Sequence, residues 1–556
     1  MFFRSKKSGQ RSYLQIVENR WEDGQSRQRV IATLGRLDQL QQDGQLDALL
    51  VSGARFSQTV LLLSAHAQGQ LPIITTRHLG PALLFERLWQ ETGCQRVLTQ
   101  LLDGRKFEFP LERAIFLTVL HRLFAPGSDR AADKWRQDYR IDGCDSLQLH
   151  HLYRAMAWLG EQLPADQQSG RTPFAPRCNK DLMEEGLLQQ RRQLFTGLEL
   201  VFFDTTSLYF EGDGGDSLGQ HGHSKDHRPD LKQMVVGTVL DGEGRPVCCE
   251  LWPGNTTDVK TLVPIVDRLQ QRFGIQRVCI VADRGMISQE TLAELEKPER
   301  AWQYILGARM RSQNEVKHEV LSRAGRYRVV HLKSPLRQDP SPLKVKEVWV
   351  EDRRYVVCLN EDEARKDAAD RAAIVAGLRE QLRSGAKSLI GNRGYRRYVR
   401  NPEETHFEID EAKIASEARY DGKWVLRTNT ELPAGDVALQ YKRLWLVEHW
   451  FRSCKSLLET RPIYHKCDET IRGHVFCSFL ALVLRQELQS RLEARGWELE
   501  WADVIRDVDE LQEVTVEQEG KQFLLRSEAQ RTCGKTFQAA GVALPPTVRQ
   551  ISPASG

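Results

Sequence analysis

The chain has 556 residues, of which 40% are hydrophobic and 28% are charged, and its net charge is only +4. This is a globular composition, and since single cores stop growing at about 250–300 residues, three or more domains are expected. No apolar run approaches the roughly 20 residues of a membrane helix, and the basic N-terminus lacks an export signal. Eleven cysteines without a C-x-x-C pair indicate reduced thiols, so we expect a cytoplasmic protein without a membrane partner.

Two local patches supply the positive charge that a nucleic-acid partner would need. Residues 1–40 hold eight Lys and Arg against four acids, and their strand-like segments flank an Asp23-Gly24 turn, which predicts a basic hairpin. Residues 379–400 hold seven basic residues against one acid, and GNRGYRRYVR interleaves arginine with Tyr395 and Tyr398. Arginine with tyrosine suits phosphate contact and base stacking, although a solvated face remains the alternative for each patch.

In chain order, residues 76–198 are predicted to be mainly helical. Three segments place apolar residues three and four positions apart, at 79–92, 111–124 and 149–163. Short β-rich runs follow at 198–210, 232–241 and 245–255. Helices at 261–273 and 288–297 then alternate with strands at 276–283 and 301–308. Three strands followed by this alternation predict a mixed α/β sheet.

The α/β pattern is interrupted and later resumes. Residues 309–431 mix strands, a charged helix and the second basic patch, which predicts an insertion. A helix from about 437 to 458, with Asp436 as its N-cap and Pro462 as its stop, and a buried helix around 470–490 then complete the pattern. The expected divisions are 1–50 (basic hairpin), 51–198 (helical), 199–308 and 432–490 (α/β core), 309–431 (insertion) and 491–556 (C-terminal region).

Two aspartates stand out within the predicted core. Asp204 lies in the strand-like VFFDTTSLYF, where an unpaired carboxylate would be costly and is expected to protonate, pair or bind metal. Asp283 ends the apolar strand RVCIVAD, and α/β proteins commonly place ligands at such strand ends. A turn or helix cap is the alternative for Asp283.

The third acid, Glu448, lies in a segment with seven-residue spacing. Tyr441, Glu448 and Lys455 are seven positions apart, which is nearly two turns of an α-helix, so their side chains are predicted to share one face. A carboxylate between a phenol and an ammonium suits a phosphodiester track with metal at the carboxylate. A surface helix with scattered charge is the alternative.

Seven motifs together carry a specific resemblance. They are DTTS at 204–207, SKDHRPDLKQ at 224–233, PGNTTD at 253–258, VADRGM at 281–286, DGKWVLRTN at 421–429, Y-x6-E-x6-K at 441–455 and IYHKCDETIRGHVF at 463–476. Over most of its length after residue 198, the chain resembles bacterial insertion-sequence transposases of the DDE type. One departure is Leu444, where that family often has arginine, and the adjacent Arg443 points about 100° away on a helix.

The resemblance implies a ribonuclease-H-like core with a strand-containing insertion between its second and third acids. Asp204, Asp283 and Glu448 would hold two Mg²⁺ or Mn²⁺ ions. Such enzymes cleave at the ends of the element and join the freed 3′-hydroxyls to target DNA, which implies double-stranded terminal repeats and target DNA as partners. The resemblance also implies a homodimer on DNA, a nucleoid-associated location, and DNA binding or dimerisation by residues 51–198. The expected phosphate contacts are Tyr441, Lys455, Arg284, Arg393, Arg396 and Arg397.

Two other functions are compatible with the same residues: a stand-alone metal-dependent nuclease and a catalytically silent DNA-binding inhibitor of transposition. The three acids argue against the silent inhibitor, and strand joining would separate a transposase from a nuclease. A zinc site at His221, His223 and His227 is disfavoured, because no cysteine is near and the spacing matches no common zinc pattern.

Overall fold

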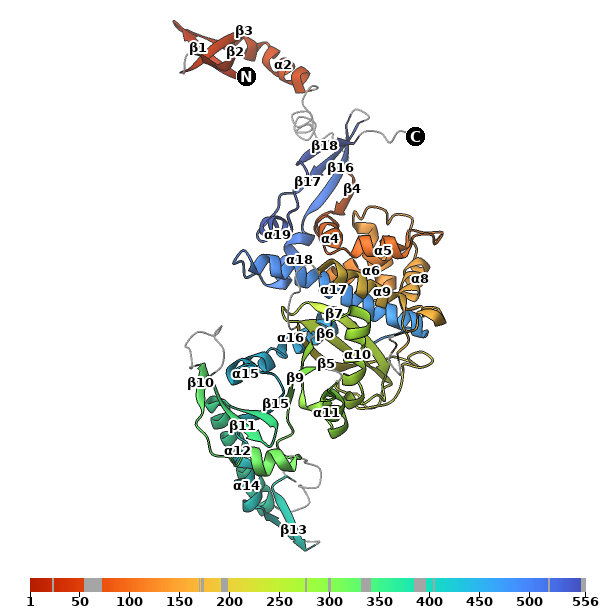
Figure 1. Ribbon diagram of the computed structural model, residues 1–556. Coiled ribbons are helices and arrows are strands. Elements are labelled where there is room, and N and C mark those ends of the chain that lie inside the picture. Colours follow the sequence, from red (N-terminus) through yellow and green to blue (C-terminus); the bar gives the residue numbers. More distant parts are fainter. Residues whose placement is uncertain are drawn as a thin grey trace. The chain divides into compact units, whose positions relative to one another are not determined.

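The computed structural model describes the chain except for residues 23–24, 55–72, 170, 172–174, 192–198, 276–277, 299–301, 332–341, 385–396, 404–405, 519–520 and 552–556. The chain forms two compact units (Figure 1). Unit 1 comprises Met1–Leu84, Gln137–Ile141 and Leu492–Gly556, and unit 2 comprises Phe85–Arg136 and Asp142–Arg491. Unit 2 therefore contains the predicted core and insertion together.

Unit 1 contains two antiparallel sheets. The first is β1 (Phe2–Ser8), β2 (Arg11–Glu22) and β3 (Gln25–Arg36), so the predicted hairpin is present with a third strand, while its turn lies outside the described residues. The second sheet has the order β18-β17-β16-β4, with bounds Val548–Ile551, Lys521–Arg526, Gln512–Gln518 and Ile73–His78. The helices are α1 (Leu37–Gln42), α2 (Gln45–Ala54), α18 (Trp501–Asp509) and α19 (Cys533–Ala540). Pairing of β4 with β16 joins distant parts of the chain.

The helical part of unit 2 agrees with the predicted periodicity. The predicted helix at 111–124 is α6 (Leu111–Phe124), most of which is buried. The remaining helices are α4 (Gly80–Glu91, which begins in unit 1), α5 (Cys94–Leu101), α7 (Asp129–Trp135), α8 (Leu149–Gly160) and α9 (Asn179–Arg191). The three segments with apolar residues at three and four spacing therefore correspond to α4, α6 and α8, whereas α5, α7 and α9 were not predicted individually.

The core of unit 2 is a mixed sheet, as the strand pattern predicts. Its strands are β5 (Glu199–Tyr209), β6 (Gln233–Asp241), β7 (Pro246–Pro253), β8 (Val278–Ala282) and β9 (Gln303–Gly307). Their spatial order is β7-β6-β5-β8-β9, with β5, β8 and β9 parallel and β6 antiparallel to both neighbours. The helices α10 (Leu262–Phe273) and α11 (Gln289–Leu295) provide the crossovers from β7 to β8 and from β8 to β9.

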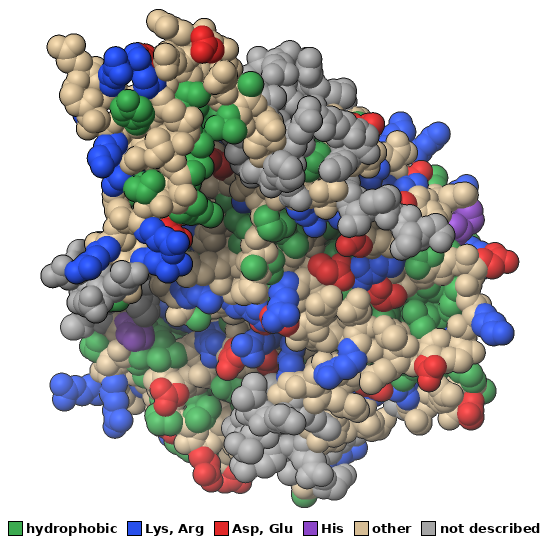
Figure 2. Space-filling view, turned by 90° about the horizontal axis from the view of Figure 1, so that it is seen from above, with side chains coloured by type: hydrophobic (Ala, Val, Ile, Leu, Met, Phe, Trp, Pro, Cys, Tyr) green, Lys and Arg blue, Asp and Glu red, His purple; other side chains and the backbone are tan. Residues whose placement is uncertain are grey.

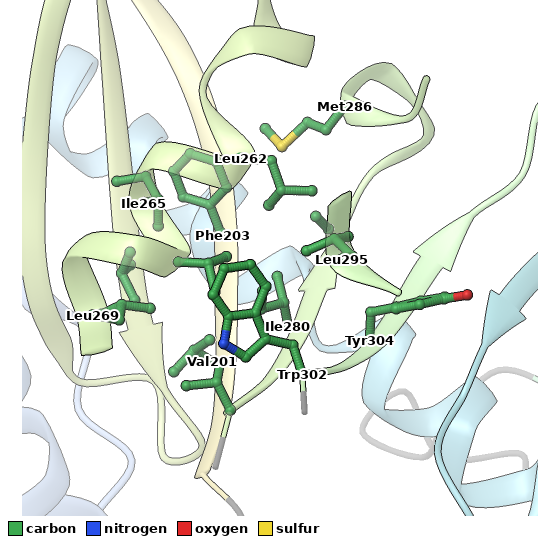
Figure 3. Close-up of a cluster of buried hydrophobic side chains, with 14 of the residues drawn as sticks. Val201, Phe203, Leu262, Ile265, Leu269, Ile280, Met286, Leu295, Trp302 and Tyr304 are labelled. Carbon is green, nitrogen blue, oxygen red and sulfur yellow. The ribbon is translucent and has the colours of Figure 1, made fainter. Parts of the chain in front are cut away.

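One face of this sheet carries a large hydrophobic cluster. Side chains of β5 and β8, among them Val201, Phe203 and Ile280, pack against Leu262 and Leu269 of α10 (Figure 3). Because side chains alternate along a strand, Phe202 and Asp204 of β5 lie on the opposite face. Alternation therefore separates the core-forming residues of β5 from its candidate acid.

The insertion continues the core sheet. β15 (Lys423–Thr428) pairs antiparallel with β9, and the sheet extends through β12 (Arg353–Leu359) and β11 (Leu343–Val350) to β10 (Arg328–His331). The other elements of the insertion are a π-helix (Val316–Val320), α12 (Glu361–Ser384), the pair β13 (Val399–Glu403) and β14 (His406–Ile409), and α14 (Glu411–Ala418). The predicted insertion is thus a strand-containing extension that begins and ends beside β9.

The predicted helix at 437–458 is not one uninterrupted α-helix. The chain forms α15 (Ala434–Lys442), α16 (Trp445–Arg452) and the π-helix η8 (Ser453–Leu457), and Pro433 stands at the N-cap instead of Asp436. Between α15 and α16 the helix is tightened, because Leu444 N donates to Tyr441 O, three residues earlier, at 3.1 Å. In η8 the helix is widened, because Leu458 N donates to Ser453 O, five residues earlier, at 3.0 Å. Tyr441, Glu448 and Lys455 therefore do not share one face of a regular α-helix, because the helix is overwound before Glu448 and underwound after it.

The last element of unit 2 is α17 (Asp468–Glu493), which contains the apolar run VFCSFLALVL as a buried segment. Among the described residues, no helix is long and apolar enough to cross a membrane.

A buried ionic cluster ties α9 to the core. Arg272 of α10 pairs with Asp181 at 3.5 Å, Glu184 at 3.0 Å and Glu250 at 3.4 Å, and its side chain is 1% exposed. Lys180 pairs with Asp181 at 2.6 Å. Because these charges are removed from water, each depends on its partners.

We expect Arg272→Met to destabilise the protein by about 3–5 kcal/mol, because it leaves buried carboxylates without their cation. Arg379→Met is the matched control, since the Arg379–Glu411 pair is more than half exposed on both sides and should contribute at most about 1 kcal/mol. Urea unfolding followed by tryptophan fluorescence measures both variants. Equal, small effects would show that the cluster does not stabilise unit 2.

Candidate active site

Asp204 and Asp283 lie side by side on neighbouring strands of the core sheet. The strands β5 and β8 are parallel, and the last pair in register is Phe203 with Ala282. Asp204 and Asp283 are the next residues on each strand, and adjacent strands lie about 4.8 Å apart. The predicted convergence of these two acids is therefore present in the backbone register.

The environment of Asp204 disfavours its charge. Burial raises the pKa of Asp204 to about 6, and the carboxylates of Asp283 and Asp258 add to this rise. Lys225 and the backbone N–H of Thr205, which donates to Asp204 Oδ1 at 2.7 Å, oppose it. This arrangement agrees with the expectation that a carboxylate in this strand must protonate, pair or bind a cation.

Asp258 and Lys225 are site residues to which the sequence analysis gave no role. Asp258 Oδ1 accepts a hydrogen bond from Thr205 Oγ1 at 2.6 Å. Lys225 Nζ lies 3.1 Å from Asp258 Oδ2 and donates to Thr205 O at 2.7 Å and Thr205 Oγ1 at 2.8 Å. We call these three residues the Lys225 triangle. Their motifs, SKDHRPDLKQ and PGNTTD, were visible in the sequence, but only the fold shows that they meet beside Asp204.

Asp283 is held by Tyr441. The phenol of Tyr441 on α15 donates to Asp283 Oδ1 at 2.9 Å. Gly307 at the end of β9 makes room for it, because a Cβ there would lie 2.4 Å from the Tyr441 hydroxyl oxygen. Burial, followed by the charge of Asp283, raises the pKa of Tyr441 well above its usual range, so the phenol is a hydrogen-bond donor at neutral pH.

Glu448 comes from the helix that covers the face of Asp204. The helix α16 packs against β5 and β6, and Arg443, just before it, stacks on the ring of Phe202 at 5.3 Å and donates to Gly242 O. Phe202 and Asp204 share this face of β5. Glu448 itself is exposed. Arg443 is thus engaged with the core sheet.

The three acids do not form a closed cluster. In the part of the chain that the structure describes, two groups of three ligand side chains have all their ligand atoms within 4.8 Å of one another: Asp129 with His465 and His474, and Glu184 with Cys248 and Glu250. Arginines engage both groups, since Arg122 Nη2 lies 2.9 Å from His474 Nδ1 and Arg272 pairs with both glutamates. Neither group therefore needs a metal to satisfy its polar atoms.

Asp204 and Asp283 nevertheless offer carboxylate oxygens that suit a divalent cation. Hard cations such as Mg²⁺ prefer carboxylate oxygens. Oδ1 of each aspartate accepts one hydrogen bond, from Thr205 N or Tyr441, and among the described residues no donor occupies Oδ2 of either. A cation there would offset the repulsion and desolvation that raise the pKa of Asp204.

Lys455 contacts a carboxylate in this structure. Its Nζ lies 2.8 Å from Asp226 Oδ1, and Arg461 Nε lies 3.2 Å from Asp226 Oδ2. Tyr441 and Lys455, two of the expected phosphate contacts, are therefore each bound to an acidic side chain.

The expected arginine contacts differ in their surroundings. Arg284 is exposed beside Asp283, and Arg309 donates to its carbonyl oxygen at 3.0 Å. Arg393, Arg396 and Tyr395 lie outside the described residues. Arg397 is exposed and pairs with Glu417.

Tyr398, which the sequence pattern suggested for base stacking, is buried at 5% exposure in a small apolar cluster, because its ring packs under α12 and α14.

Basic and acidic side chains are interspersed on the face shown in Figure 2, in keeping with the small net charge.

We expect Asp204→Asn to increase the free energy of unfolding of the metal-free protein at pH 7.5, by an amount on the order of 2 kcal/mol. The thermal midpoint should therefore rise. The pKa of Asp204 in the folded protein, about 6, lies above its value in the unfolded chain, so the folded protein favours the neutral carboxyl. Its contribution to the stability of the fold is therefore present at low pH and is lost as the pH rises through about 6. Asn keeps the neutral form at every pH, and the difference between the proteins should vanish towards pH 4.

Differential scanning calorimetry between pH 4 and 8 measures this effect. Asp213→Asn is the control, since that side chain is 95% exposed. An unchanged or lower midpoint for Asp204→Asn at pH 7.5 would contradict the raised pKa.

Comparison with known proteins places the chain in a family. Residues 196–484, more than half of the chain, match the model of the transposase DDE domain, and residues 3–66 match the N-terminal domain of the IS1634 family transposases. None of the curated proteins compared with the chain matches it significantly.

Among solved structures, the cryo-EM structure of the piggyBac transposase synaptic complex with hairpin DNA is similar, with 10% sequence identity, a TM-score of 0.37, and coverage of 77% of this chain and 79% of that chain. A TM-score this low carries no argument, so the assignment rests on the family models. The DDE domain in general belongs to metal-dependent enzymes that act on DNA. The chain is a member of the insertion-sequence transposases of the DDE type.

Proposed function

We propose that this transposase cleaves DNA at the ends of its insertion sequence and joins the freed 3′-hydroxyls to target DNA at a site formed by Asp204, Asp283 and Glu448. The observation that carries the proposal is the adjacency of Asp204, in the middle of β5, and Asp283, just after the end of the parallel strand β8, together with the packing of the helix that presents Glu448 against β5. The mixed α/β sheet that carries these two acids supports a ribonuclease-H-like core.

The three carboxylates would hold two Mg²⁺ or Mn²⁺ ions through the oxygens that are left without donors. When bound, two such ions can activate an oxygen nucleophile and stabilise the leaving oxygen of a phosphodiester. Asp204 must be ionised to serve as a ligand, and Lys225 favours that form. Tyr441 orients Asp283 through its hydrogen bond to Oδ1. No side chain needs to form a covalent intermediate, because water and the 3′-hydroxyl are the nucleophiles.

DNA contacts would come from Arg284, which is exposed beside Asp283, and from the basic patch of the insertion with Arg393, Arg396 and Arg397. The basic sheet β1–β3 and the helical region are further candidates for contacting terminal repeats. Pairing of two DNA ends would require two subunits, so we propose a homodimer on DNA in the bacterial cytoplasm, associated with the nucleoid.

We expect Asp204→Asn to abolish cleavage of a duplex that carries the ends of the element, while the affinity for that duplex stays within about twofold. The substitution removes a metal ligand but no positive charge. Gel assays of cleavage and of binding in Mg²⁺ and Ca²⁺ measure the two effects separately. Cleavage by Asp204→Asn would refute the assignment of the acids, and cleavage by the unaltered protein without strand joining would favour a stand-alone nuclease.

We expect replacement of Arg393, Arg396 and Arg397 by Ala to weaken DNA binding and to lower the slope of log K against log salt by about 1 for every phosphate that is no longer neutralised. Arg397, the member of this trio that the structure describes, pairs with Glu417 and not with the three acids, so we expect cleavage at saturating protein to persist. Arg365→Ala is a control on the same insertion, with a 69% exposed side chain paired only locally to Asp362. A salt slope equal to that of the unaltered protein would show that the patch faces solvent.

A further inference from the structure

The sheet β1–β3 of unit 1, drawn in red in Figure 1, has two faces of different character. β1 and β2 pair in regular register, and side chains alternate along a strand. The even-numbered residues of β1 and the odd-numbered residues of β2 therefore share one face with their partners on β3, and we call it the open face. The helix α1 packs on the other face, the packed face, where a Cβ at Gly35 would lie 3.5 Å from Leu40 and Leu14 is 8% exposed.

Cations of the packed face are neutralised within it, whereas two cations of the open face lack a partner. The carboxylate of Glu18 on the packed face lies 2.8 Å from Arg20 Nε and 3.9 Å from Arg29 Nη1. Among the residues that the structure describes, the open face carries no Asp or Glu. Lys6 and Arg11 on that face are exposed, and neither is paired with an acid of the described chain. The open face is therefore electropositive and suits an anionic partner.

The two remaining cations of the open face are held in place. Arg36 pairs with Asp38, which follows β3, at 2.5 Å. Arg4 is fixed by neutral groups, since its Nη1 donates to Gln28 Oε1 at 2.8 Å and its Nη2 donates to Gln15 Oε1 at 2.9 Å. A guanidinium has five N–H donors, so Arg4 keeps its charge and further donors for another acceptor. Arg4 is thus a cation whose orientation is fixed before any ligand binds.

Beyond Val17, the last partner of β1, the strands β2 and β3 continue as a two-stranded ribbon. Asn19 and Gln28 are direct cross-strand partners on the open face of this ribbon, and both are exposed. Trp21, two residues further along the same face, is 77% exposed. The major groove of DNA admits a two-stranded β-ribbon, and Asn or Gln side chains can bind adenine there through two hydrogen bonds. The open face therefore offers amides for base edges as well as cations for phosphates.

We propose that the open face recognises the duplex at the ends of the element, with the β2–β3 ribbon in the major groove. Asn19 and Gln28 contact base edges, and Lys6 and Arg11 contact phosphates. This inference rests on the proposed function, because cleavage at the ends requires that the ends be told apart from other DNA. Cations on phosphates add affinity for any sequence, whereas amides on base edges add affinity for one sequence, so the two roles can be measured separately.

Asn19→Ala tests the base contact, since this side chain makes no hydrogen bond or ion pair within the described chain. Fluorescence anisotropy of the full chain measures its affinity for a duplex that carries the ends of the element and for a shuffled duplex of the same length. We expect the ratio of the two affinities to fall about tenfold, while the affinity for the shuffled duplex stays unchanged. Gln28→Ala should lower the ratio in the same way. An unchanged ratio in both variants would overturn base reading by the open face.

Lys6→Ala and Lys7→Ala form a matched pair, because both side chains are exposed on β1 but lie on opposite faces. Lys6→Ala should lower the slope of log K against log salt by about 1 for both duplexes and leave the affinity ratio unchanged. Lys7→Ala should leave the slope as it is. Equal losses of slope would show that the open face is not the contact surface. A lower affinity ratio in Arg27→Ala, on the packed face, would assign base reading to that face instead.

The unaltered protein separates failure of this inference from failure of the proposed function. If it does not cleave the duplex with the element ends in Mg²⁺, the proposed function fails, whichever face binds DNA. If it cleaves that duplex while Asn19→Ala, Gln28→Ala and Lys6→Ala bind as tightly and as selectively as the unaltered protein, only the assignment of the open face fails. Tighter binding of the separated single strands than of the duplex would contradict a ribbon in the major groove.

Discussion

Burial of a carboxyl group beside other acids is the constraint on which the candidate site depends. Burial raises the pKa of Asp204, and the charges of Asp283 and Asp258 add to the rise. Lys225 contacts Asp258 and Thr205, the residue next to Asp204, and Tyr441 contacts Asp283. Neither of them occupies Oδ2 of Asp204 or Asp283. The chain thereby lowers the cost of the acidic cluster while leaving oxygens for a cation.

The core sheet explains how distant residues reach this site. Asp204 and Asp283 are neighbours because β5 and β8 are parallel and share a register. The insertion leaves the core after β9 and returns through β15, which pairs with β9 in turn. The insertion therefore returns the chain to β9, where Tyr441 of α15 lies against Gly307. The following helix, α16, packs on β5.

Local patterns predicted the elements well. Periodicity placed a helix at 111–124, where α6 spans Leu111–Phe124, and the apolar run before Asp283 is the buried strand β8. The prediction was wrong where geometry departs from an ideal helix. The segment of Glu448 is split into α15, α16 and a π-helix, and no residue count distinguishes that from one continuous helix.

Tyr398 illustrates a second limit. Its place among arginines suggested base stacking, but the ring is buried against α12 and α14, and burial depends on partners that are remote in the sequence.

The sequence alone determined the family resemblance, the order of helices and strands, and the identity of the candidate acids, because these follow from local periodicity and from motifs of a few residues. Only the tertiary structure decided which side chains surround those acids. Lys225, Asp226 and Asp258 meet Thr205 and Lys455 across strand, loop and helix. Such contacts depend on sheet register and helix packing, and both arise from the simultaneous burial of many apolar side chains, which no local pattern encodes.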